Sequence, residues 1–205
     1  MKLKRTLRQV LGVRPKNQSP GASSKIRSRS NAARPEPVFV TQGDRQRTFV
    51  NPPTIYFYEK SMPYYSFTNF SPHPVRLQGK KYPTSEHLFQ AMKFLGHKPQ
   101  IAEHIRTVGK NPRLAFNEAR RFSSEVRKDW REVNVAVMDE VIRLKFEQHS
   151  ALRDQLLSTG NARLVENSGA MDAFWGNGAD GKGRNELGRA LMRLRDHFRS
   201  GNVRI

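Results

Sequence analysis

The sequence contains no cysteine, and its apolar runs are short. The absence of cysteine excludes a disulfide framework, a thiolate metal site and a cysteine nucleophile. No apolar stretch approaches the roughly 18–20 residues that a membrane-spanning helix needs. The six histidines lack the spacing of a zinc site, and no G-x-S-x-G nucleophile elbow is present. We therefore expect a soluble, intracellular protein without a membrane partner or a metal site.

Acidic residues are scarce. The chain has 37 Lys and Arg against 18 Asp and Glu, and its formal net charge is +19. The excess is concentrated in residues 1–50, which hold 12 basic residues but only two acids, Glu36 and Asp44. This segment is also rich in polar residues and poor in aromatic ones, so it cannot bury enough apolar surface to offset its ordering entropy. We predict a disordered basic arm at 1–50 and a folded domain at 51–205.

Several roles suit this arm. Its basic, acid-poor composition is typical of a mitochondrial transit peptide. The same composition suits a nuclear signal or an arm that binds nucleic acid. A solubilising tail without any partner is the simplest alternative. We expect a cytoplasmic location, with mitochondrial or nuclear targeting by residues 1–50 as the alternatives.

The folded part combines long helical patterns with a few short strand patterns. Strands are expected at 54–59, at 75–82 with a turn at Gly79, and at 162–167. Helices are expected after Thr84 or Ser85, after Asn111, at 129–148, after Ser150 and at 185–198. This content predicts an α+β fold, a helix-dominated single domain with a small set of short strands.

The helix in YPTSEHLFQAMKF (82–94) has two contrasting faces. Glu86, Gln90 and Lys93 fall within about 60° of one another at 100° per residue. A core-facing stripe occupies the opposite face: Leu88, Ala91, Met92 and Leu95. The polar stripe is either a solvated surface or part of a functional site, and spacing alone favours the solvated surface.

A second unusual segment is the glycine-rich DAFWGNGADGKGRNELG (172–188). It leads into a helix whose free N–H groups could bind an anion, with positive side chains beside it. The candidates for phosphate or ribose binding are Gly176, Gly178, Lys182 and Asn185. The pattern is neither a Walker loop nor a dinucleotide fingerprint, so a structural turn is the alternative.

Aromatic residues flank these segments. Trp130, Trp175 and the aromatic residues at 64, 65, 67 and 70 could form a wall on which a planar base stacks. Packing in the core is the alternative for each of them.

Several of these segments occur together, in the same order, in one family. FYEKSMPYYSFTNFSPHPVRLQGKKYPTSEHLFQAMKF resembles the start of the NADAR (YbiA-like) domain. The likeness continues through KDW at 128–130, KFEQHSALRDQLLSTG at 145–160, LVE at 164–166 and DAFWGNGADGKGRNELGRALM at 172–192. It spans about 54–197, nearly the whole folded part.

The resemblance implies an N-glycosidase that cleaves the bond between a ribose C1′ and an amino nitrogen of a base. By motif, it assigns catalytic roles to Glu86, Trp130, Asp172 and Trp175. It implies substrate contacts for the N-F-S loop and the neighbouring polar face, which are Asn69, Phe70, Ser71 and Gln90. No cofactor is implied, because hydrolysis needs only acid–base groups and water.

The implied chemistry gives each group a role. A carboxylate at Glu86 would stabilise an oxocarbenium-like sugar or activate water, and Asp172 would help the nitrogen leave. The tryptophans would enclose the base. Lys93 has two interpretations of equal weight: a nucleophile that forms a Schiff base with an opened ribose, or a contact to Glu86 or to a phosphate.

Two substrate classes belong to the resemblance. One is ADP-ribose attached to guanine, in a nucleoside or in nucleic acid; the other is the phosphorylated ribosylaminopyrimidines of riboflavin synthesis. The basic arm would help with a nucleic-acid substrate, so we favour the ADP-ribosyl class. A non-catalytic module that binds ADP-ribose or a nucleotide is the alternative from a different functional class.

Overall fold

The computed structural model describes residues 52–201, so the predictions for the arm at 1–50 lie outside the described residues. The helices are α2 (Ser85–Ala91), α3 (Pro99–Thr107), α4 (Pro112–Arg121), α5 (Trp130–Gln148), α6 (Ser150–Ser158) and α7 (Glu186–Arg199). The strands are β1 (Thr54–Phe57), β2 (Val75–Leu77), β3 (Lys80–Tyr82) and β4 (Arg163–Glu166). Short 3₁₀ turns lie at Tyr65–Phe67, Ser123–Glu125 and Gly169–Met171. The predicted helix-dominated α+β class is confirmed.

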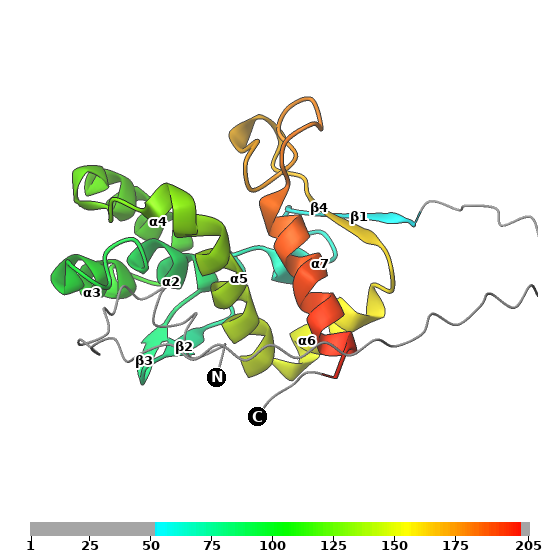
Figure 1. Cartoon of the computed structure of the whole chain (residues 1–205), viewed down its shortest axis with the longest axis horizontal. Helices are drawn as coiled ribbons and strands as arrows, with labels where there is room; N and C mark the ends of the chain where they lie inside the picture. The colour runs from blue at the N-terminus through cyan, green and yellow to red at the C-terminus, as the bar shows by residue number, and fades with distance from the viewer. Residues whose placement is uncertain (1–51, 202–205) are drawn as a thin grey trace, which may run out of the picture. The chain divides into compact units, whose positions relative to one another are not determined.

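The long helix α5 is the central element (Figure 1). It packs against α2, α6, α7 and β2, while α3 and α4 pack against α2. Strand β1 pairs in parallel with β4, which comes much later in the chain, and α7 packs on β4. Parallel strands need a long crossover, and here the helices from α2 to α6 lie within it. The pairing therefore brings the start and the end of the described domain together.

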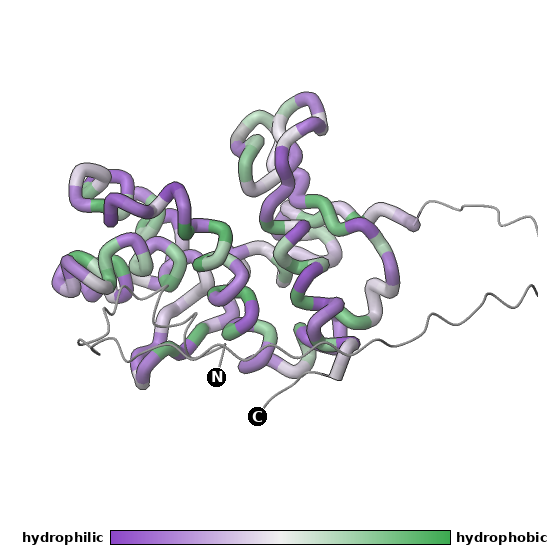
Figure 2. The backbone as a smooth tube through the Cα atoms, in the orientation of Figure 1, coloured by the Kyte–Doolittle hydropathy of each residue, from purple (hydrophilic) through white to green (hydrophobic). Residues whose placement is uncertain are grey.

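The core follows from the amphipathic helices. Hydrophilic and hydrophobic segments alternate along them in Figure 2. In α5, Val137 and Val141 are fully buried, whereas Val133 and Leu144 are partly buried against the core. No helix within residues 52–201 is long and apolar enough to cross a membrane.

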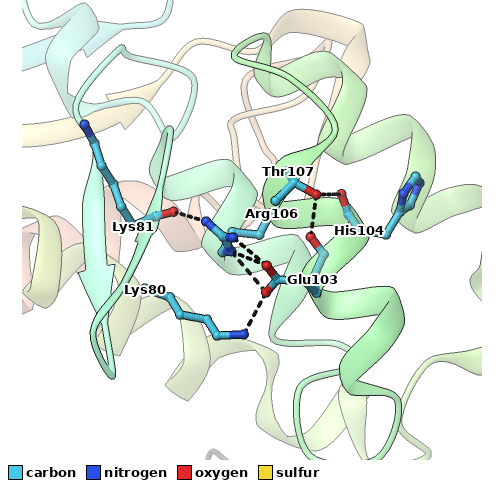
Figure 3. Close-up of polar contacts among 6 residues, drawn as sticks. All are labelled: Lys80, Lys81, Glu103, His104, Arg106 and Thr107. Carbon is cyan, nitrogen blue, oxygen red and sulfur yellow. Dashed lines mark hydrogen bonds and ion pairs between the residues drawn. The ribbon is translucent and has the colours of Figure 1, made fainter.

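Strands β2 and β3 form a hairpin that one ion pair and one hydrogen bond join to α3 (Figure 3). Gln78 and Gly79 both have positive φ, as a tight two-residue turn requires. Glu103 accepts hydrogen bonds from Lys80 Nζ at 2.7 Å and from Arg106 Nη2 at 2.5 Å. The Arg106 guanidinium also donates to the Lys81 carbonyl at 2.9 Å. This exposed network fixes the hairpin beside α3.

Candidate functional site

A cavity of about 860 Å³ lies among α2, α4, α5, the loop before β2 and the segment after β4. It is lined by nine of the residues that the sequence singles out: Tyr65, Asn69, Phe70, Glu86, Gln90, Lys93, Trp130, Asp172 and Trp175. Its volume is in the range of small-molecule sites, about 300–1,000 Å³. The structure therefore gathers residues from four separate sequence segments around one hollow.

Glu86 is placed in the cavity by the first turn of α2. The Thr84 hydroxyl caps this helix, and the Glu86 N–H donates to the Asn69 carbonyl at 3.1 Å. Gln90 Nε2 donates to Glu86 Oε1 at 2.7 Å. Glu86 is only 6% exposed, so its face of the helix is not a solvated surface. Burial raises the pKa of the Glu86 carboxyl, while the Gln90 hydrogen bond and the nearby Lys93 and Arg113 charges oppose this rise.

Lys93 follows the end of α2 and reaches the same cavity. Its carbonyl accepts the Arg127 N–H at 3.0 Å, which ties this segment to the start of α5. Its Nζ lies 5.6 Å from the centre of a Trp130 ring. No carboxylate in the described part of the chain lies within 4.0 Å of Nζ. Burial lowers the pKa of Lys93, and the Glu86 charge opposes this effect. The amine is thus desolvated and not tied into an ion pair.

The two tryptophans contact a common phenylalanine. The Phe89 ring lies 5.2 Å from a ring of Trp130 and 5.2 Å from a ring of Trp175, nearly edge-on to the latter. Phe174 adds an edge-on contact to Trp175 at 4.9 Å. Both indoles are partly buried and line the cavity. The arrangement gives a rigid aromatic wall beside Glu86.

Asp172 holds the turn that carries Trp175. Its Oδ1 accepts the backbone N–H groups of Phe174 and of Trp175, both at 2.8 Å. These two hydrogen bonds fix the position of the Trp175 indole.

The remaining predicted residues do not line this cavity: Tyr64, Phe67, Ser71, Gly176, Gly178, Lys182 and Asn185. Ser71 is fully buried, and its hydroxyl accepts a hydrogen bond from Lys145. Lys182 is exposed. A Cβ on Gly176 would lie 1.9 Å from the Ser168 hydroxyl oxygen, so glycine permits close backbone packing there.

The Asn185 side chain is hydrogen-bonded to the backbone of β4. Its Oδ1 accepts the Glu166 N–H at 2.9 Å, and its Nδ2 donates to the Leu164 carbonyl at 2.8 Å. Both contacts fasten the start of α7 to β4. In this structure the glycine-rich segment thus fixes the position of β4 and of the Trp175 turn.

The sequence reasoning gave no role to Glu166, which lines the cavity. Burial raises the pKa of its carboxyl to about 8, and the charges of Asp172 and Glu86 add to this rise. The available signal was its position at the end of a predicted strand, within the LVE motif. Its burial depends on pairing with β1, which spacing along the chain does not reveal.

Cationic side chains complete the lining. The Arg113 guanidinium lies 5.1 Å from the centre of the Phe70 ring and 5.6 Å from that of Phe116. Arg184 lies 4.5 Å from the centre of the Phe174 ring and pairs with Glu186 at 2.9 Å. Such cations stacked on rings suit a ligand with both planar and anionic parts. Within residues 52–201, no group of three or more His, Asp or Glu could hold a metal ion.

Known proteins resemble the chain over this whole region. The model of the NADAR domain matches residues 56–199. The N-glycosidase YbiA of Escherichia coli (strain K12) is 47% identical over 153 residues, which are 75% of this chain and 90% of that protein. The riboflavin biosynthesis protein VVA0006 of Vibrio vulnificus (strain YJ016) is 40% identical over 144 residues, 70% of this chain and 38% of that protein.

A solved structure agrees with these sequence matches. The NMR structure of E. coli YbiA superposes with a TM-score of 0.66 at 42% identity, covering 78% of this chain and 94% of that one. The likeness thus includes both the fold and the segments that line the cavity. The chain therefore belongs to the NADAR domain family and is a hydrolase that acts on N-glycosyl bonds.

Proposed function

We propose that the chain releases ADP-ribose from ADP-ribosylated guanine by hydrolysing the bond between ribose C1′ and the amino nitrogen of the base. The observation that carries this proposal is the carboxyl group of Glu86, which is buried in an aromatic and cationic cavity large enough for such a ligand. The catalytic centre consists of Glu86 and Lys93, with the Trp130–Phe89–Trp175 wall beside them.

Glu86 acts on C1′. Departure of the nitrogen leaves positive charge on the sugar, which a nearby carboxylate stabilises while it takes a proton from the attacking water. The Gln90 hydrogen bond fixes one oxygen of Glu86. The amide oxygens of Asn69 and Gln90 are buried and accept no hydrogen bond from any residue in 52–201. They are therefore available to the hydroxyl or amino hydrogens of a bound riboside.

Lys93 has two roles that fit the geometry. As a nucleophile, its desolvated amine condenses with the aldehyde of an opened ribose to give a Schiff base. As a contact, its ammonium holds the substrate and balances the charge of Glu86. Borohydride reduction during turnover distinguishes the roles, because only a Schiff base leaves a stable covalent adduct on Lys93.

The size and the charges of the site favour an ADP-ribosyl group. A diphosphate needs more than one cationic contact, and Arg113 and Arg184 both line the cavity. The Phe70–Arg113–Phe116 stack offers a second planar surface, separate in sequence from the tryptophan wall. An adenine and a guanine would each have an aromatic partner.

A ribosylaminopyrimidine phosphate is the second candidate substrate. The name of the Vibrio vulnificus relative, a riboflavin biosynthesis protein, favours it. Such a compound contains one base and one phosphate, so it would leave part of the cavity unfilled. A module that only binds ADP-ribose would not need the buried Glu86 carboxyl.

The test is mass spectrometry on the full chain with ADP-ribosylated guanosine, the same mark in single-stranded DNA, and a ribosylaminopyrimidine phosphate, each separately. We expect release of ADP-ribose from the guanine compounds, and its loss in Glu86→Gln. Glu103→Gln makes the same chemical change outside the cavity and should retain the activity. Cleavage of only the pyrimidine compound would reassign the substrate, and binding without cleavage would support the binding module.

A further inference from the structure

The departing amino nitrogen needs a proton, and this requirement rests on the proposed function. An amine bound to C1′ is a poor leaving group unless it is protonated as the bond breaks. The group that supplies the proton must line the cavity and must carry that proton near neutral pH. We propose that Glu166, rather than Asp172, is the catalytic acid that protonates the leaving nitrogen.

The backbone fixes Glu166 firmly. It is the last residue of β4, in register with Phe57 of β1. Its N–H donates to Asn185 Oδ1 at 2.9 Å, and its carbonyl accepts the Asn177 N–H at 2.9 Å. The side chain lines the cavity, and none of the described residues forms a hydrogen bond with its carboxyl group. Its backbone is therefore held in place, and its carboxyl group remains available to a substrate.

Glu59 lines the cavity but is exposed, and the three other carboxyl groups of the cavity differ in the partners of their oxygen atoms. Asp172 accepts two backbone N–H groups, and Glu86 accepts from Gln90 and faces Lys93 and Arg113. Glu166 has no such partner, and Asp172 and Glu86 oppose its ionisation. Like charges that share a site force the proton onto the least stabilised member. That member is Glu166.

The other titratable groups around Glu166 do not change this assignment. Burial raises the pKa of the Tyr58 phenol, just after β1, and the Glu166 charge adds to this rise. The cations that line the cavity, Lys60, Lys93, Arg113, Arg131 and Arg184, form no ion pair with Glu166 within 4.0 Å in the described part. Burial raises the pKa of the Glu166 carboxyl to about 8, which keeps the proton in place at neutral pH.

The step balances as follows. The electron pair of the C1′–N bond passes to the nitrogen, which takes the proton of the Glu166 carboxyl group. Water forms the new C1′–O bond and gives its proton to the Glu86 carboxylate. The products are the free amine of the base and the released ribosyl group, and one water is consumed. Proton transfer from Glu86 back to Glu166, through solvent, restores the enzyme.

The first test is the pH dependence of kcat/KM for ADP-ribosylated guanosine. Wild type should lose activity as the pH rises through about 8, because Glu166 then ionises. Glu166→Gln should lose about 10²-fold or more of kcat/KM and lack this alkaline limb. Asp172→Asn should keep the limb, whatever its rate. A Glu166→Gln enzyme that retains the wild-type rate or the limb would overturn the proposal.

The second test needs no substrate and so separates this proposal from the proposed function. Infrared spectroscopy of the full chain at neutral pH should show a carboxylic-acid C=O band that Glu166→Gln removes and Asp172→Asn keeps. If this band is absent from wild type, or if it survives in Glu166→Gln, Glu166 is not the proton carrier. If the band behaves as expected but no riboside is cleaved, the proposed substrate class fails while the assignment of the proton stands.

Discussion

Acidic side chains have opposite surroundings at the β2–β3 hairpin and in the cavity. Beside the β2–β3 hairpin, Glu103 is exposed and satisfied by Lys80 and Arg106, and these partners lower its pKa to about 2 (Figure 3). In the cavity, removal from water raises the pKa values of the Glu86 and Glu166 carboxyl groups. The first arrangement joins two elements at the surface. The second keeps reactive groups away from water at a cost in stability.

The comparison shows where the fold tolerates electrostatic strain. Exposed ion pairs add little to stability, about 0–1 kcal/mol, but they also cost little. Buried carboxyl groups without cationic partners destabilise the folded state, and proteins retain them mainly at functional sites. Removing a charge should therefore have opposite effects on stability in the two regions.

The largest effect is expected from Glu86→Gln. Loss of the carboxylate at C1′ should reduce kcat/KM by about 10³-fold, or about 4 kcal/mol of transition-state stabilisation. The melting temperature should stay the same or rise, because the change removes a buried ionisable group. Steady-state kinetics and thermal unfolding of the same preparation measure both quantities. If the melting temperature and the activity both fell strongly, Glu86 would instead have a structural role.

Glu166→Gln should make stability less dependent on pH. The folded-state pKa of Glu166, about 8, lies above its ordinary value, so the folded state holds the proton more tightly than the unfolded state. Wild type must then lose stability as the pH rises from about 4.5 to about 8, by up to about 4 kcal/mol. Urea unfolding at about pH 5 and about pH 8.5 should show a larger free energy of unfolding for the variant than for wild type only at the higher pH. Parallel pH curves for both proteins would contradict this.

Lys145→Met should destabilise the domain by about 2–4 kcal/mol. Lys145 is fully buried, and its Nζ donates to the carbonyls of Ser66 and Thr68 and to the Ser71 hydroxyl, at 2.5–2.8 Å. These acceptors belong to the loop that presents Asn69 and Phe70 to the cavity, and methionine would remove the buried ammonium group that joins them. Denaturant unfolding measures the change, and Lys128→Met on the exposed surface is the control. A loss of stability no larger than that of the control would show that the loop keeps its conformation without Lys145.

Glu103→Gln should have the smallest effect, below about 1 kcal/mol, because its partners are solvated. Its folded-state pKa lies below its ordinary value, so its contribution is present near neutral pH and is lost as the pH falls from about 4.5 towards 2. Added salt should further reduce the contribution of Glu103 to stability. A double-mutant cycle with Lys80→Gln measures the coupling. A value above about 2 kcal/mol would remove the contrast between the two regions.

Local patterns in the sequence predicted much of this architecture. Helical spacing brought Glu86, Gln90 and Lys93 to one side of the chain, and the structure gathers them in one cavity although α2 ends at Ala91. The strand patterns and the long helix α5 were also predictable, because their periodicity is strong. Helix α3 was missed, since Lys98 before it is not one of the residue types that mark a helix start.

The rest depended on contacts between distant segments. The strand that ends at Glu166 was predicted, but its burial comes from β1 and from neighbours that spacing cannot show. The glycine-rich segment suggested a phosphate cradle, because glycines and a helix N-terminus are typical of one. The side chain of Asn185 is instead hydrogen-bonded to β4, and Gly176 packs against Ser168.

The parallel pairing of β1 with β4 has a consequence for synthesis of the protein. A ribosome makes Thr54–Phe57 first among the described strands, and their partners in Arg163–Glu166 follow only after α2–α6. Contacts between such distant residues form slowly and late. A nascent chain that has reached only α6 contains Glu86, Lys93 and Trp130 but lacks Glu166, Asp172 and Trp175. On the proposed mechanism, the growing polypeptide therefore gains activity only after its last strand and helix have emerged.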